Sequence, residues 1–145
     1  MSQPLREPYG TSAFSCGRSW EALEERRAAL FAQMLTLQNA TPSNCHAVVG
    51  DFLEFFDETG IGLFRDEEEW VFRAVRPTPM VIIRALEEHI GITSVIRALV
   101  AAAAAKCVDL RVVHHLGRLL DDHLVLEEDE IRPLVGTRPL RVASA

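Results

Sequence analysis

The sequence predicts an all-α protein built as an antiparallel four-helix bundle. Apolar residues recur at helical spacing through four long stretches, no stretch alternates as a strand does, and the seven Pro mostly fall outside the periodic stretches. A hydrophobic content of 48% over 145 residues suits one packed domain. We therefore expect a bundle over residues 19–135, an extended N-terminal arm over residues 1–18 and a C-terminal tail over residues 136–145.

The first two helices are expected over residues 20–38 and 43–75. Ser19 is a suitable N-cap for the first helix, because its hydroxyl can accept a hydrogen bond from an unpaired amide of the first turn. Gly60 and Gly62 interrupt the second pattern. Each glycine weakens a helix by ~1 kcal/mol relative to alanine, so a local irregularity is predicted there.

The third and fourth helices are expected over residues 79–105 and 110–132. Asp109 is a plausible N-cap for the fourth helix, and Pro133 is expected to stop it, since proline cannot donate the next backbone hydrogen bond. Short links between the four helices are typical of a bundle.

Composition excludes several classes of function. The net charge of −6 argues against nucleic acid as a partner, because phosphate binding needs a basic surface. The longest apolar run, residues 98–105, is far short of the ~20 residues of a membrane span, and the first residues lack the apolar core of a signal peptide. Cys16, Cys45 and Cys107 form no CxxC pair. We expect reduced thiols in a cytoplasmic protein without a membrane partner.

Two segments of the chain resemble each other. Residues 63–72 and 123–132 each place two consecutive Glu four and five residues after the first position, beginning with Glu67 and Glu127. They occupy equivalent places near the ends of the second and fourth helices. A bundle of two similar helix pairs would bring the two segments together in its interior.

The pair His123-x-x-x-Glu127 points to metal chemistry. Residues four apart share a helix face, and a carboxylate inside a bundle must be paired or bound to a metal. Glu67 on the second helix and His89 on the third have similar settings. Two His and two Glu together suit iron or manganese, and zinc less well. Taken singly, residues 66–69 are typical of a solvated acidic run, and His89 of a hydrogen-bonded core residue.

These motifs resemble the hemerythrin family, specifically the bacterial HHE cation-binding domains, over about residues 20–135. Four segments carry the resemblance: Asp51-Phe52-Leu53-Glu54-Phe55-Phe56, Glu67-Glu68-x-x-Val71-Phe72, Leu86-Glu87-Glu88-His89, and Leu120-Asp121-Asp122-His123-x-x-x-Glu127-Glu128. The resemblance implies a four-helix bundle with a non-haem di-iron centre that binds dioxygen, nitric oxide or peroxide.

Carried over position by position, the resemblance implies four candidate metal ligands: Glu67, His89, His123 and Glu127. Part of the family's ligand set is missing. The first-helix His position falls on about Arg26, the second-helix His position is Leu63, and the first His of the third-helix pair is Ala85.

Two hypotheses follow, and the first is favoured. In the first, the four ligands hold one or two iron ions, or manganese or zinc, with water, Glu88, Asp122 or His115 completing the shell, and the protein senses or binds a small diatomic or peroxide ligand. In the second, the bundle is metal-free, a salt bridge from Arg26 satisfies Glu67 or Glu127, and the domain is an interaction or regulatory module with a protein partner. Enzymatic activity stays open, but no Gly-rich phosphate loop, GxSxG elbow or activated cysteine supports a hydrolase or transferase.

Overall fold

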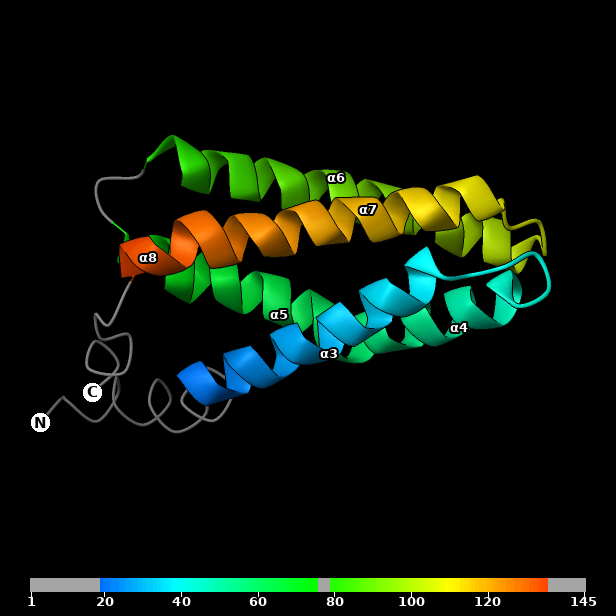
Figure 1. Cartoon of the computed structure of the whole chain (residues 1–145), viewed down its shortest axis with the longest axis horizontal. Coiled ribbons are helices and arrows are strands. Elements are labelled where there is room, and N and C mark those ends of the chain that lie inside the picture. Colours follow the sequence, from blue (N-terminus) through cyan, green and yellow to red (C-terminus); the bar gives the residue numbers. More distant parts are fainter. Residues whose placement is uncertain (1–18, 76–78, 136–145) are drawn as a thin grey trace, which may run out of the picture.

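A computed structural model describes residues 19–75 and 79–135, and over these ranges the protein is all-helical, with four helices and no strand. The helices lie side by side along the long axis of the molecule (Figure 1). The prediction of an all-α bundle is confirmed to this extent. The expected arm and tail lie outside the described residues.

The helix bounds follow the sequence pattern closely. The first helix is α3, the second comprises α4 and α5, the third is α6, and the fourth comprises α7 and α8. Their bounds are Trp20–Gln38 for α3, Cys45–Phe55 for α4, Ile61–Asp66 for α5, Met80–Ala104 for α6, Leu110–Leu126 for α7 and Arg132–Val135 for α8.

Both predicted N-caps are confirmed. The Ser19 side chain accepts a hydrogen bond of 3.0 Å from the amide of Ala22, and the Asp109 side chain accepts one of 2.9 Å from the amide of Arg111. Each side chain thus satisfies one of the amides that a helix N-terminus leaves without an internal partner.

The second and fourth helices contain three five-residue π-helical turns: Phe56–Gly60, Glu67–Val71 and Glu127–Ile131. The first ends at Gly60, so the irregularity predicted near the glycines is confirmed. A Cβ at Gly60 would lie 2.2 Å from Cδ1 of Phe56, so this position needs a residue without a side chain. The second helix ends in a 3-10 turn, Phe72–Ala74.

The prediction that Pro133 stops the fourth helix is wrong. The chain stays helical through Pro133 to Val135, as α8. Pro133 is the second residue after the last π turn, within the continuous fourth helix. Its fixed φ fits a helical backbone, and the N–H that it lacks would have bonded to a carbonyl of the π turn, where the regular α pattern of hydrogen bonds is already interrupted.

The four helices enclose one apolar core. Helix α3 contacts α4 and α7, and α6 contacts the same two helices. Fully buried side chains of this core include Leu30 of α3, Phe52 of α4, Ile92 of α6 and Leu116 of α7. No described helix has the length and apolar character needed to cross a membrane.

Candidate metal centre

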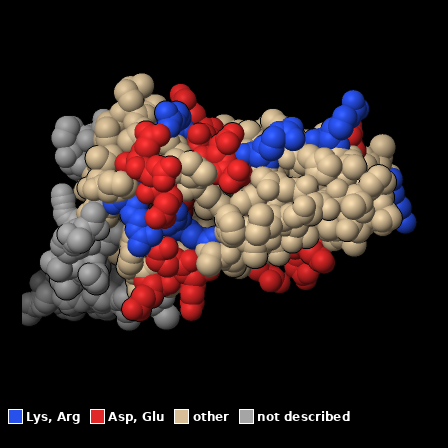
Figure 2. Space-filling view, in the orientation of Figure 1, with Lys and Arg blue, Asp and Glu red and all other residues tan. Residues whose placement is uncertain are grey.

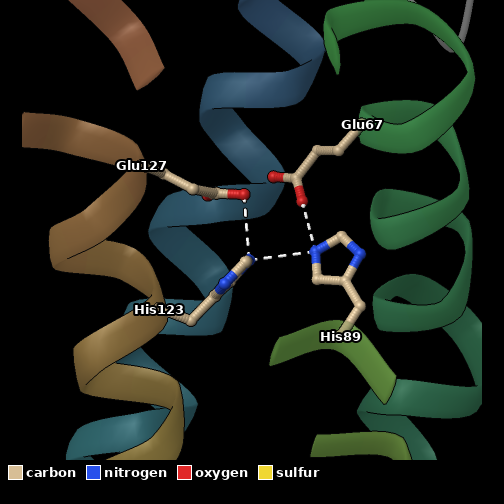
Figure 3. A group of neighbouring side chains, drawn as sticks. All are labelled: Glu67, His89, His123 and Glu127. Atoms are coloured by element: carbon tan, nitrogen blue, oxygen red, sulfur yellow. Dashed lines mark hydrogen bonds and ion pairs between the residues drawn. The ribbon is translucent and has the colours of Figure 1, made fainter. Parts of the chain in front are cut away.

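The core is interrupted at one place by four titratable side chains: Glu67, His89, His123 and Glu127. None is more than 5% exposed, and they are the buried polar or charged side chains of the described residues. Figure 3 shows all four pointing toward one another, with α3 running beside them. The structure thus brings together the four residues that the sequence predicted to converge.

The two similar acidic segments have the same local structure. Glu67 directly follows α5, Glu127 directly follows α7, and each opens a π-helical turn. A π turn holds one more residue than an α turn and is common at functional sites, where it changes the direction of the side chains that follow. The repeat seen in the sequence therefore corresponds to a structural repeat in which each segment delivers one buried carboxylate.

The inner distances are those of a compact centre. Nε2 of His89 lies 3.2 Å from Oε1 of Glu67, and Nε2 of His123 lies 3.0 Å from Oε2 of Glu127. The two Nε2 atoms are 2.9 Å apart. One donor atom from each of the four residues lies within 4.8 Å of all the others.

The outer nitrogen of each imidazole contacts a further carboxylate. Nδ1 of His89 lies 2.7 Å from Oε2 of Glu68, and Nδ1 of His123 lies 2.7 Å from Oε1 of Glu88. A carboxylate accepts, so each Nδ1–H donates outward. The lone pair of each neutral imidazole is therefore on Nε2 and faces the centre. This is the arrangement in which histidine binds metals.

The centre consequently needs a positive charge. Two imidazole lone pairs and two carboxylate oxygens face one another, and Oε1 of Glu67 and Oε2 of Glu127 accept no hydrogen bond. Buried acceptors without donors are costly, and either a proton or a metal cation between them would relieve the repulsion.

Without a metal, protons supply that charge. Burial alone would lower the pKa of His123, but contact with Glu127 and Glu88 outweighs it and raises the pKa to about 9. Burial would raise the pKa of Glu127, but the neighbouring His123 and Arg27 hold it at about 2. Burial and the nearby charge of Glu127 raise the pKa of Glu67 well above its usual value.

Helix α3 contributes a cation, but not from the expected residue. Nε of Arg27 lies 3.1 Å from Oε1 of Glu127, whereas Arg26 pairs with Asp66 at 3.0 Å. The prediction that Arg26 forms a salt bridge to Glu67 or Glu127 is therefore wrong, because the next residue, Arg27, makes this contact. Neighbouring residues of an α-helix point in directions about 100° apart. Figure 2 shows a group of acidic and basic side chains in the half of the molecule that carries α8, with further basic side chains toward the other end.

The other positions named from the sequence lie around the centre in different ways. Leu63 and Ala85 are fully buried, so apolar side chains fill two positions where the resemblance would place imidazoles. His115 and Asp122 are exposed and do not belong to the buried group. Glu88 contacts the outer nitrogen of His123 and does not complete the inner set.

Sequence reasoning gave no role to Glu68 or Arg27. Glu68 directly follows the candidate ligand Glu67, and this adjacency was the only feature of the sequence that could have indicated a role for it. Arg27 had no signal beyond lying next to Arg26.

A small cavity adjoins the carboxylate side of the centre. Its volume is about 20 Å³, and its lining includes Arg27, Glu67 and Glu127. That space holds about one water-sized molecule.

No family model, no curated protein and no solved structure matches this chain. The resemblance to hemerythrins therefore depends on the motifs alone. What points to a function is the geometry of the four buried side chains.

Proposed function

We propose that this protein is a metal-binding, antiparallel four-helix bundle of the hemerythrin-like type, in which Glu67, His89, His123 and Glu127 hold non-haem iron. The observation that carries the proposal is the convergence of four buried donor atoms, with both imidazoles already oriented by outer carboxylates. Such carboxylate–histidine–metal arrangements fix the ring and raise its basicity.

The donor set fits a divalent cation. Imidazole nitrogen and carboxylate oxygen suit iron and manganese, and also zinc. Bonds of about 2.1 Å place opposed ligands about 4.2 Å apart. The donors here lie within 4.8 Å of one another, close to that separation.

We infer one ion per chain. A second metal about 3.5–4 Å away would need further ligands. The described positions that the resemblance would use, Leu63 and Ala85, carry apolar side chains, and Arg27 already places a positive charge beside Glu127.

The role we propose is binding or sensing of dioxygen, nitric oxide or peroxide. An iron ion in this set supplies reversible coordination of such a ligand. The chain's own contribution is a buried position in the core, a cavity of about 20 Å³ against the two carboxylates, and the Arg27 guanidinium as a hydrogen-bond donor next to that cavity. A cytoplasmic location belongs to the same proposal.

Metal uptake tests the proposal directly. The chain is purified without chelator, titrated anaerobically with Fe(II), and its bound metal is measured by elemental analysis. We expect one equivalent per chain for the wild type and for the control His115→Ala, and none for His123→Ala. A wild type that takes up no iron would overturn the proposal.

A second candidate function follows from the Arg27–Glu127 contact. In a metal-free protein this ion pair and the protonated His123 would compensate the buried carboxylates, and the bundle would act as an interaction module. The same titration, repeated with Mn(II) and with Zn(II), separates the two candidates, since the second requires that none of the three ions binds.

A further inference from the structure

A groove lies between α6 and the second helix, on the outer side of His89. Its volume is about 610 Å³, which is within the range of small-molecule sites. The apolar part of its lining comes from both helices: Leu53, Phe56, Ile61, Phe64, Ile90, Ile96 and Val100.

Three of these apolar side chains are left in water. Ile61 is 46% exposed, Ile90 is 70% exposed and Val100 is 52% exposed. Single exposed apolar residues are common, but three along one groove mark a surface that gains by being covered.

Two cations line the same groove, together with the carboxylates of Asp57 and of Glu68, whose Oε2 contacts His89. Arg65 of α5 and Arg97 of α6 are exposed, and neither forms an ion pair with these carboxylates or with another residue in ranges 19–75 and 79–135. This sets them apart from Arg26, Arg27 and Arg132, which all pair with acidic side chains. Unpaired guanidinium groups at an apolar groove are complementary to a carboxylate attached to an apolar body.

We propose that this groove binds a small amphipathic carboxylate, with its anionic group at Arg65 and Arg97 and its apolar body against the exposed isoleucine and valine side chains. The lining residues His89 and Val100 are eleven residues apart on α6, so the groove is about 16 Å long. That length suits a medium-chain acid. The inference goes beyond the proposed metal function, because none of its recognition contacts is to a candidate metal ligand.

The inner end of the groove nevertheless adjoins the metal centre. Glu68 and His89 are both part of the lining, and the Glu68 side chain is 42% exposed there while its Oε2 contacts Nδ1 of His89. Phe64, also in the lining, stacks on the His89 ring with centroids 3.9 Å apart. An acid bound in the groove would thus lie beside the contacts that orient His89.

Calorimetric titration of the full, metal-free chain with three ten-carbon probes tests the proposal. We expect decanoate to bind, and decanol and decyltrimethylammonium to bind at least tenfold more weakly. Arg65→Gln and Arg97→Gln should each weaken decanoate binding roughly tenfold, since each removes a charge-assisted hydrogen bond. Arg118→Gln, on exposed α7 surface, is the matched control and should leave binding unchanged.

A second variant locates the site. Val100→Trp adds a bulky side chain at a half-exposed lining position and should abolish decanoate binding without altering the helical circular dichroism spectrum. Equal binding of decanol and decanoate, or unchanged binding by Val100→Trp, would overturn the proposal. A dimer that Ile90→Asp dissociates, in a chain that binds no decanoate, would also overturn it and assign the groove to a second copy. None of these measurements needs metal, so they test the groove separately from the proposed metal function.

Discussion

His89 and His123 each use both ring nitrogens, and this double use defines the centre. A lone buried histidine is ordinarily satisfied by one hydrogen bond and carries no information about metals. Here the outer nitrogens contact Glu68 and Glu88 at 2.7 Å each, which leaves both inner nitrogens facing the two buried carboxylates. The outer carboxylates therefore decide what the inner nitrogens can bind.

Removing an outer carboxylate should weaken metal binding without removing a ligand. In Glu68→Gln and Glu88→Gln the outer carboxylate that orients the imidazole and raises its basicity is lost. We expect each variant to bind metal with 10–100-fold weaker affinity. Titration with Co(II) measures this effect. Glu87→Gln is the control, next to Glu88 in the chain. Affinities equal to that control would show that the outer contacts do not orient the rings.

Arg27 should be a stabilising residue of the metal-free protein. Its side chain is 13% exposed and its partner Glu127 is 6% exposed, so removal leaves a buried carboxylate with less compensation. We expect Arg27→Met to lower the free energy of unfolding by about 3 kcal/mol, measured by urea denaturation in the presence of chelator. The exposed Arg111→Met is the control and should stay within about 0.5 kcal/mol of the wild type. A similarly small effect at Arg27 would argue against its role.

At the scale of elements, the sequence predicts the helices well and their irregular turns only in part. The first helix has the predicted bounds because a capping serine and a regular apolar repeat act together over residues 20–38. Glycines signal the π turn that ends at Gly60, but no residue type signals those that begin at Glu67 and Glu127. A π turn inserts one residue into a 3.6-residue period, and the packing of the neighbouring helices decides where it falls. The helical residues beyond Pro133 were not predicted either, because they follow directly on the last π turn.

Deleting one residue from the last π turn tests whether the extra residue is needed for packing. Because a π turn holds one more residue than an α turn, the chain without Asp129 can continue as regular α-helix with Ile131, now 2% exposed, still facing the core. We therefore expect the deletion to change the free energy of unfolding by no more than about 1 kcal/mol, measured by urea denaturation. Asp129→Ala keeps the length of the chain and is the control. A loss of about 2–5 kcal/mol, as for removal of a large core side chain, would show that the extra residue is needed for packing.

At the scale of the whole molecule, the sequence predicts which residues meet but not how the charges around them are arranged. Glu67, His89, His123 and Glu127 could be found because each lies in an acidic or histidine motif on a helix with an apolar face. Arg27 could not be found, because the first helix carries no matching motif that fixes its rotation, and an error of one residue turns the side chain about 100°. The groove beside His89 arises from the distance between two helices, which no local pattern encodes.

Metal binding should stabilise the whole bundle. Since the four donors come together only in the folded chain, metal at about 100 times its dissociation constant should add about 2.7 kcal/mol to the free energy of unfolding. For a chain of this size that corresponds to a rise of roughly 5–10 °C in Tm, and chelator should reverse it. Differential scanning calorimetry measures both. His123→Ala, which removes one donor, is the control and should show no rise.

The pH dependence of the metal-free protein should reflect the same centre. The raised pKa of His123 contributes stability that is complete below its ordinary value of 6.5 and is lost as pH rises through about 9. The lowered pKa of Glu127 contributes stability that is complete above its ordinary value of 4.5 and is lost as pH falls toward 2. The raised pKa of Glu67 acts against folding above 4.5, because the unfolded chain then ionises more readily than the folded one.

Together these shifts predict that the chelated protein is most stable between about pH 4.5 and 6.5 and becomes less stable toward pH 9. Urea denaturation across pH 4–9 measures the profile. Metal competes with protons for the same atoms and is bound more tightly as pH rises, so the metal-loaded protein should become more stable over the same range. The difference in the free energy of unfolding between the metal-loaded and the chelated protein should therefore increase with pH. A chelated chain whose stability keeps rising from pH 6.5 to 9 would show that protons do not supply the charge at the centre.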